Sequence, residues 1–377
     1  MRNQLHVSIW MSGLLSLLVA GCVPIEVSVS PDGKVLIPRE EGFVSFDQAE
    51  GTGQVAWRPK TGQPAFAVFA PDGKRFLAVT KGGDTGPMSG MGSGFNVTLV
   101  APGGEPRRLL AASNLTYARW SGDGKHVSLT RVADSAKPPI EENLPELVLV
   151  RTADGKQQTI ASNVSPIHRW FPDSRHILAF QITAKGKEDG TYTGSLVRLD
   201  VTTGKAAPMA VAIGGKKVFI DLSPDGKKAL FTAIAAAKAG QKVSAKSEDE
   251  SQLYELDVAS GAVRAVKAGV AFAIYSPKGT KVLVGMEGDQ DGTFTLAVGD
   301  AALKDLHTIA TDAAEGTGDM GSSVDIYPAW LNDDSVLYLA WHLAYGTAGK
   351  NLHLVAVGAD GTNRRDLQGK IDAALLK

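Results

Sequence analysis

One acidic segment has ligands spaced as in a calcium-binding loop. Glu287, Asp289 and Asp291 alternate along the chain and a glycine follows them, and calcium loops open with carboxylates at alternate positions ahead of a turn-making glycine. The acidic ligands that should come later are absent, because Thr295 and Val298 stand in their places. We therefore interpret the segment as an acidic hairpin tip.

Sulfur and imidazole ligands do not gather at metal-binding spacings either. Met88 and Met91 lie in a glycine-rich segment. Thioethers favour Cu(I), but no His or Cys stands beside the pair, and contact with a partner is an equally natural use of methionine. The histidines beyond the N-terminal segment are scattered, at His126, His168, His176, His307, His342 and His353. These patterns predict no metal and no cofactor.

Motifs for nucleophilic catalysis and phosphate binding are missing from the sequence. No Gly-x-Ser-x-Gly elbow occurs, and the glycine-rich residues 90–94 are not followed by the Lys-Ser/Thr pair of a phosphate-binding loop. We therefore nominate no catalytic residue from the sequence.

A five-residue turn motif organises the rest of the chain. It reads Ser-Pro-Asp-Gly-Lys at residues 223–227. Intact or altered copies begin at Ser30, Ala70, Ser121, Phe171, Ser276 and Leu331. Steps of about 40 to 55 residues are typical of solenoids and propellers. Because Pro presets φ, Asp bonds nearby amides and Gly takes a positive φ, each copy predicts a tight turn between two strands.

Strand-like runs stand on both sides of each motif. A large apolar residue usually precedes it, as Phe69, Trp120 and Trp330 do, and a short apolar run follows it. Two further strands and a second tight turn complete most repeats. Four antiparallel strands per repeat describe a propeller blade, and blades must stack around an axis to bury their faces.

Seven motif copies predict an all-β fold, a seven-bladed β-propeller of four-stranded antiparallel blades. Residues 42–46 and 54–57 supply the third and fourth strands of the first blade. The alternative has six blades, with the segment before about Pro64 as an accessory. A β-sandwich with chance recurrence of turns fits the regular spacing less well.

The turn motifs resemble the PD40 (WD40-like) repeats of TolB-type β-propellers. The resemblance rests on stretches such as Trp-Ser-Gly-Asp-Gly-Lys at 120–125 and Leu-Ser-Pro-Asp-Gly-Lys at 222–227, and it covers nearly the whole chain after residue 21. It implies the propeller fold but little about function, because such propellers serve many roles. TolB itself has six blades, so seven copies depart from that pattern.

The first 21 residues have the features of an export signal. Arg2 supplies the positive start, and the apolar stretch that follows is too short for a stable membrane span. Residues 18–22, Leu-Val-Ala-Gly-Cys, resemble the lipobox of bacterial lipoproteins, which implies cleavage before Cys22 and a lipid on it. Cys22 is the only cysteine, so no disulfide forms within one chain. A general secretory signal that ends in a chance cysteine is the alternative.

These features divide the chain into a signal peptide at 1–21 and a propeller at 22–377. Val23 follows the cysteine, in place of the Asp that the family links to retention in the inner membrane. The resemblance therefore implies a lipid-anchored protein of the cell envelope, in the outer membrane and facing the periplasm or the exterior. Basic and acidic residues nearly cancel, at a formal net charge of -1, and no Lys/Arg cluster occurs, so we expect no nucleic-acid partner.

Connections differ in length between the two ends of the predicted blades. Turns that join strands one to two and three to four are short, whereas long connections fall at the other end. The long ones span residues 82–94, 133–145, 184–194, 235–251, 285–292, 311–325 and 343–350. Binding residues are often on loops held by a rigid scaffold, although such a rim also simply tolerates insertions.

Aromatic residues and methionines near this rim are the candidate partner contacts, because such side chains dominate binding hot spots. They are Met88, Met91, Phe95, Tyr192, Phe294, Tyr327 and Tyr345. Arg119, Arg169 and Asp221 hold equivalent positions at the ends of successive first strands. They are candidates to line the axial channel and bind a charged ligand. We favour the alternative that they form salt bridges between packed blades, because buried charges usually occur in pairs.

Together these features predict a membrane-anchored propeller that binds rather than catalyses. Its expected partner is an envelope protein or a cell-envelope polymer, recognised through the long loops on one rim. The alternative is an enzyme that acts on saccharides or peptides in the channel. Converging titratable groups at the channel mouth would indicate the enzyme, and an exposed apolar patch on the rim would indicate the binding protein.

Overall fold

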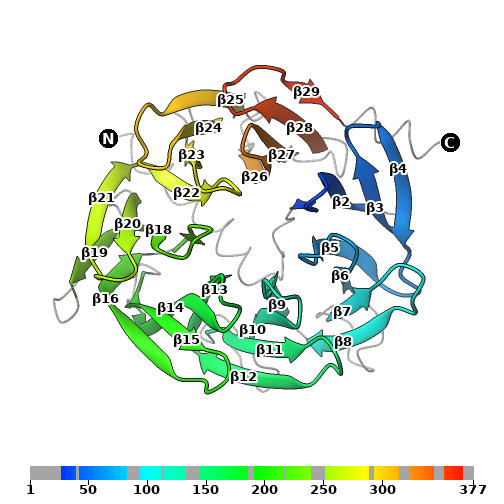
Figure 1. The fold of residues 1–377 in the computed structure, drawn as a ribbon, viewed down its shortest axis with the longest axis horizontal. Helices are drawn as coiled ribbons and strands as arrows, with labels where there is room; N and C mark the ends of the chain where they lie inside the picture. Colours follow the sequence, from blue (N-terminus) through cyan, green and yellow to red (C-terminus); the bar gives the residue numbers. More distant parts are fainter. Residues whose placement is uncertain are drawn as a thin grey trace, which may run out of the picture.

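A wheel of β-sheets makes up the part of the chain that the structure describes. The computed structural model describes residues 27–39, 42–82, 94–112, 114–132, 144–185, 191–215, 218–238, 251–287, 293–313, 323–343 and 352–367. All regular elements in these residues are strands, and they form seven antiparallel sheets in a ring (Figure 1). The predicted seven-bladed propeller is confirmed, and the six-bladed alternative is wrong. None of the described ranges contains a helix with the length and apolarity that crossing a membrane requires.

Each blade is built from strands that follow one another in the chain. Blade 1 contains β1 (Ser28–Val29), β2 (Lys34–Arg39), β3 (Gly42–Asp47) and β4 (Thr52–Trp57). Blade 2 contains β5 (Gln63–Phe69), β6 (Phe76–Lys81), β7 (Phe95–Val100) and β8 (Arg107–Ala112). Blade 3 contains β9 (Asn114–Trp120), β10 (His126–Val132), β11 (Glu146–Arg151) and β12 (Gln157–Ser162). Blade 4 contains β13 (Val164–Trp170), β14 (His176–Lys185), β15 (Tyr192–Asp200) and β16 (Ala206–Gly215).

The remaining three blades complete the ring in the same order. Blade 5 contains β17 (Ile220–Leu222), β18 (Lys228–Ala233), β20 (Gln252–Asp257) and β21 (Val263–Ala268). Blade 6 contains β22 (Val270–Tyr275), β23 (Lys281–Glu287), β24 (Thr293–Asp300) and β25 (His307–Ala313). Blade 7 contains β26 (Ser323–Asn332), β27 (Ser335–Leu343), β28 (Leu352–Gly358) and β29 (Arg365–Asp366).

One predicted loop contains a strand. Residues 235–251 were expected to be a connection in blade 5, but β19 (Ala235–Lys238) pairs with β16 at the outer edge of blade 4. The edge of β16 presents free backbone groups, and a neighbouring segment satisfies them by adding a strand. Blade 4 therefore has five strands, and blade 5 contributes the fifth.

The repeated motif forms the predicted turn between the first and second strands. In the copy at 223–227, the Ser223 hydroxyl donates to Asp225 at 2.7 Å and the Lys227 amide donates to the same carboxylate at 3.1 Å. The Lys228 amide then closes the turn on Ser223 Oγ at 2.9 Å. Gly226 has a φ of +71°, which a glycine adopts without strain. The turn is therefore specified by the motif's own side chains.

Neighbouring turns also pack on one another around one end of the wheel. A Cβ atom on Gly226 would lie 2.8 Å from Cδ of Pro172, which belongs to the preceding blade's motif. A Cβ atom on Gly279 would lie 3.0 Å from Cδ of Pro224. The glycine therefore serves twice, since it permits the backbone conformation and leaves room for the neighbouring proline.

Apolar side chains fill the spaces between blades. Trp120 of blade 3 is buried in the cluster shared with blade 2, and its Nε1 donates to the Val68 carbonyl oxygen at 3.0 Å. Trp330 of blade 7 repeats this contact with the Ile274 carbonyl of blade 6 at 3.1 Å. The aromatic before the motif therefore packs between sheets, as the sequence predicted.

Among the described strands, blades 1 and 7 share none, and packing joins them. Blades 1 and 7 each use consecutive strands only. A buried cluster joins them, in which Val35 and Phe46 of blade 1 meet Leu337, Leu354 and Leu367 of blade 7. Apolar burial contributes about 25 cal/mol for each Å² removed from water, so this cluster holds the two ends of the propeller together.

Candidate functional site

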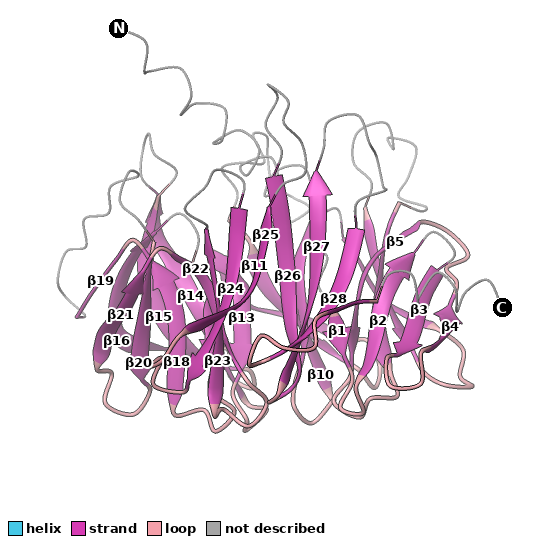
Figure 2. Cartoon of the chain, turned by 90° about the horizontal axis from the view of Figure 1, so that it is seen from above, coloured by secondary structure: helices cyan, strands magenta, loops and turns pink. Residues whose placement is uncertain are grey.

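The two ends of the wheel differ in the connections they carry. The short turns lie at one end, which we call the turn face (Figure 2). The second strands end and the third strands begin at the opposite end, as the register pair Lys81–Phe95 of β6 and β7 illustrates. We call this end the strand-end face. The described strands thus place the flanks of all the long connections between second and third strands on one face, as predicted, while the connections themselves largely lie outside the described residues.

A row of aromatic rings and guanidinium groups crosses the first strands of blades 3 to 6 and reaches the third strand of blade 6. The Arg119 guanidinium lies 4.6 Å from the centre of the Tyr117 ring. The Arg169 guanidinium lies 5.8 Å from the same ring and 5.4 Å from the centre of Phe219. Ring contacts then continue the row into blade 6. We call these residues the inner row: Tyr117, Arg119, Arg169, Phe219, Phe272 and Phe294.

The inner row continues through aromatic pairs near the strand-end face. Phe219, which precedes β17, and Phe272 of β22 have ring centres 5.8 Å apart. Phe272 and Phe294 of β24 are stacked at 5.8 Å with an interplanar angle of 19°. All three rings are half-buried, so each keeps an accessible part. Cation–π and ring contacts thus link side chains of four consecutive blades into one row.

Asp221 holds the inner row to the backbone of the next blade. Nε of Arg169 donates to Oδ1 of Asp221 at 2.7 Å, and Oδ2 accepts the Tyr275 amide at 2.8 Å. Arg169 also bonds the Tyr117 hydroxyl. The four groups span blades 3 to 6, and the side chains of Tyr117, Arg169 and Asp221 are mostly buried. The favoured interpretation of Arg169 and Asp221 as a salt bridge between blades agrees with this geometry.

A buried polar cluster joins blades 3 and 4. His168 is fully buried, and its Nδ1 lies 3.2 Å from the Pro166 carbonyl oxygen, which only accepts. Nδ1 therefore carries the proton, and Nε2 accepts from the Ser128 hydroxyl at 2.6 Å. The Trp170 indole donates to the same hydroxyl at 2.8 Å. Burial lowers the pKa of His168 to about 3, so the ring is neutral at physiological pH.

The Ser128–His168 pair has the atoms of a nucleophile and a base, but neither side chain reaches a solvent-accessible site. Both residues have no exposed surface, and a nucleophile must meet its substrate. The hydroxyl is also held by the Trp170 indole. The pair therefore satisfies buried polar groups and links two blades.

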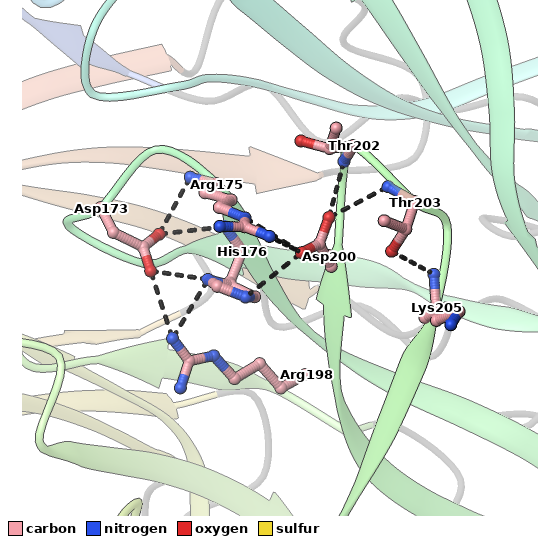
Figure 3. A network of polar contacts seen from close by, with 8 residues as sticks. All are labelled: Asp173, Arg175, His176, Arg198, Asp200, Thr202, Thr203 and Lys205. Atoms are coloured by element: carbon pink, nitrogen blue, oxygen red, sulfur yellow. Dashed lines mark hydrogen bonds and ion pairs between the residues drawn. The ribbon is translucent and has the colours of Figure 1, made fainter.

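A second polar cluster lies on the turn face of blade 4. Asp173 accepts from the Arg175 and His176 amides and contacts the His176 and Arg198 side chains (Figure 3). Asp200 accepts two bonds from Arg175 (Figure 3). The Thr203 and Thr202 amides, together with Arg175, lower the pKa of Asp200 to about 2. The cluster stabilises two adjacent turns, because every carboxylate oxygen has a donor.

The predicted contact residues fall in different environments. Phe95 is only 2% exposed and packs in the core between blades 2 and 3. Tyr192 is half-buried at the start of β15, and burial raises the pKa of its phenol. Phe294 belongs to the inner row, and Tyr327 lies in β26, although its side chain is not described. The other predicted positions lie outside the described residues: Cys22, Met88, Met91, Tyr345 and residues 288–292 of the acidic segment.

Sequence reasoning found Arg119, Arg169 and Phe294 but missed Tyr117 and the two other phenylalanines. A signal was present, since an aromatic residue stands four positions before several motif copies. It occurs as Phe66, Tyr117, Phe219, Phe272 and Tyr327. Among the described residues, no group of three or more His, Cys, Asp or Glu is placed to hold a metal ion.

Comparison with known proteins gives similarity of fold. No family model matches the chain, and no curated protein matches its sequence. TolB from Acinetobacter baumannii superposes with a TM-score of 0.51 at 15% identity, covering 88% of this chain and 78% of that chain. By fold, the protein is similar to TolB. The predicted TolB-like propeller is thereby confirmed as a fold.

Two proteases contain similar propellers. The tricorn protease gives a TM-score of 0.62 at 9% identity, over 91% of this chain and 34% of that chain. Acylaminoacyl peptidase gives 0.58 at 12% identity, over 96% of this chain and 55% of that chain. This chain therefore spans about a third and about half of those proteins, and the likeness concerns the propeller alone.

Proposed function

We propose that the protein is a lipid-anchored, non-enzymatic binding propeller that recognises a protein or a cell-envelope polymer through its strand-end face. The inner row carries this proposal. Arginine and aromatic side chains dominate binding hot spots, and here they form one connected row across blades 3 to 6, in which Arg119 and the three phenylalanines are partly exposed. The row ends at Phe294, which pairs with Glu287 where the strands flank the long connection of blade 6 on the strand-end face.

The charged groups on the inner strands support binding over chemistry. Arg169 and Asp221 neutralise one another at 2.7 Å, and Asp221 is also held by the Tyr275 amide. A general acid or base needs a titratable group within reach of a substrate, whereas these groups hold the blades in register. The alternative of a channel enzyme acting on saccharides or peptides stays a prediction.

The proposal also includes a lipid anchor on Cys22. A lipid on Cys22 anchors the mature chain in the outer membrane, on the face toward the periplasm or the exterior, and leaves the propeller free to meet envelope partners. One acyl-anchored end and a rigid wheel suit a scaffold protein. The support for this step is the lipobox-like sequence at 18–22. Replacing Cys22 by serine should release the protein from the membrane fraction, and retention in that fraction would contradict the anchor.

Capture of partners from envelope extracts tests the binding role. The full-length protein should retain a defined partner, and that partner should be lost when residues 82–94 are replaced by a short Gly-Ser linker. The matched control replaces the exposed turn-face residues Lys125 and Lys227 by serine and should capture as the wild type does. Unchanged capture after all the long connections are shortened would contradict the proposal.

A further inference from the structure

A cleft lies between the last strand of blade 1 and the outer strands of blade 2. Its volume is about 500 Å³, within the range of small-molecule sites, roughly 300–1,000 Å³. Trp57 at the end of β4 forms one wall, and Thr80, Asn96, Thr98 and Arg108 on β6, β7 and β8 form the other. The cleft shares no residue with the inner row.

The residues that blade 2 contributes to the cleft differ from those at the equivalent positions of the other blades. In each of blades 1 to 6 the pairing between the third and fourth strands contains one register shift. The first residue pair after that shift can therefore be compared between blades. In blade 2 this pair is Thr98–Arg108. In the other five blades it is Val44–Val55, Val148–Thr159, Val197–Pro208, Tyr254–Ala265 and Ala297–Thr308. Only blade 2 has a charge here, so the fold does not require it.

The neighbouring pair shows a second departure. Thr80 and Asn96 face one another across β6 and β7, where blade 3 has Arg131 and Glu146. In blade 3 the two charges satisfy each other at 2.9 Å. In blade 2 the Oδ1 atom of Asn96 is buried and accepts no hydrogen bond. A buried acceptor without a donor is unfavourable, and a ligand that donates a hydrogen bond to Asn96 Oδ1 would remove this cost.

The charge of the cleft is positive. Arg58, Lys60 and Arg108 line it together with a single acid, Glu105. Among the described residues none of the three cations has an acidic partner. Guanidinium groups bind carboxylates in bidentate geometry, so the preferred ligand is an anion.

The remaining groups narrow the class of anion. The Asn96 acceptor and the hydroxyls of Thr80 and Thr98 match a ligand with several hydroxyl groups. The half-buried Trp57 ring stacks on Phe43 at 5.8 Å between ring centres. Its remaining exposed part offers an apolar surface to the C–H groups on one face of a saturated ring. We propose that this cleft binds an acidic sugar residue, a pyranose that carries a carboxylate. This proposal does not rest on the inner row or on the proposed function.

Ligand-observed NMR titration of the full chain with D-glucuronate tests the proposal, with D-glucose, acetate and inorganic phosphate as comparisons. Glucuronate should bind more tightly than all three. Arg108→Gln should weaken glucuronate binding about 10- to 100-fold, because it removes a charge-assisted hydrogen bond. Asn96→Asp should weaken it at least as much, since it places a like charge beside the ligand.

Arg264→Gln is the matched control, because Arg264 is an exposed arginine on the outer strand of blade 5. It should leave glucuronate binding unchanged. Equal affinity for phosphate or acetate would overturn the proposal in favour of a general anion site. Equal affinity for glucose and glucuronate would overturn the proposal, because it would show that the carboxylate of the ligand is not recognised. Absence of glucuronate binding, or an equal loss in the control variant, would overturn it outright.

Discussion

Arg169 on the inner strand of blade 4 donates to Asp221 on the inner strand of blade 5 at 2.7 Å, and the same carboxylate accepts the Tyr275 amide of blade 6. One side chain thereby connects three blades. Both charged side chains are mostly buried, with exposures of 14% and 10%. Removing one partner of such a pair leaves the other charge without compensation.

Asp221→Ala should therefore destabilise the protein by about 3 kcal/mol. Asp154→Ala is the control, because Asp154 pairs with Arg151 on the surface and both side chains are about half exposed. Surface pairs contribute about 0–1 kcal/mol. Urea denaturation measures both free energies of unfolding. Equal losses in the two variants would mean that the inner pair does not hold the blades together.

The buried imidazole predicts a pH dependence with a definite sign. The pKa of His168 is lowered to about 3 in the folded protein, whereas an unfolded histidine has a pKa of about 6.5. Below pH 6.5 the unfolded chain binds a proton that the folded chain excludes, so stability falls as the pH falls. Above pH 6.5 both states are neutral at this residue, and it contributes no pH dependence.

His168→Gln should remove this dependence. Between pH 7 and pH 5 the wild type should lose about 1–2 kcal/mol more stability than the variant. Carboxylates such as Asp200, whose pKa is lowered to about 2, contribute at lower pH because unfolded aspartate titrates near 4. Chemical denaturation at the two pH values measures the free energy of unfolding of both proteins. An equal change between pH 7 and pH 5 in the wild type and the variant would show that His168 is charged or exposed in the folded protein.

Because successive turns pack on one another, adding a methyl group to a turn glycine should lower the stability of the protein. Gly226→Ala adds a Cβ atom 2.8 Å from Pro172 and places alanine at a φ of +71°. Gly51→Ala is matched, because Gly51 has a φ of +65° but no atom within 4 Å of its added Cβ. Backbone strain costs about 1–2 kcal/mol in both, and the clash should cost about 1–3 kcal/mol more in the first. Similar melting temperatures would contradict the interlocked ring of turns.

Asn96 links stability to the cleft between blades 1 and 2. Because its Oδ1 has no donor, Asn96→Leu should raise the free energy of unfolding by about 1 kcal/mol. Asn163→Leu is a useful contrast, since Asn163 takes a φ of +58° and leucine there should destabilise the chain. Thermal unfolding of both variants measures the difference. A loss of stability in Asn96→Leu would show that the acceptor is satisfied in solution.

The fold was predictable from the sequence because the residues of the motif determine the conformation of the turn by themselves. Ser223, Asp225 and Gly226 specify a turn through hydrogen bonds and a positive φ that involve no distant residue. Seven copies of a local rule then define the wheel. The pairing of Ala235–Lys238 with β16 was not predictable in this way, because it depends on two segments from different blades.

The candidate site was predictable only in part for the same reason. The equivalent positions of Arg119 and Arg169 marked them as a set, and pairing of Arg169 with Asp221 followed from their charges. The stacking of Phe272 between Phe219 and Phe294 joins three separate segments. The cleft beside Trp57 depends on how blade 2 meets blade 1, so it required the three-dimensional structure.

Photo-crosslinking in intact cells tests the central claim most directly. A photoreactive amino acid is placed at Lys81 or Thr183 near the strand-end face, or at Lys125 or Lys227 on the turn face; all four side chains are exposed. The account predicts a discrete crosslinked product from Lys81 and Thr183 and none from Lys125 and Lys227. Crosslinks from the turn face alone, or of equal strength from both faces, would contradict it.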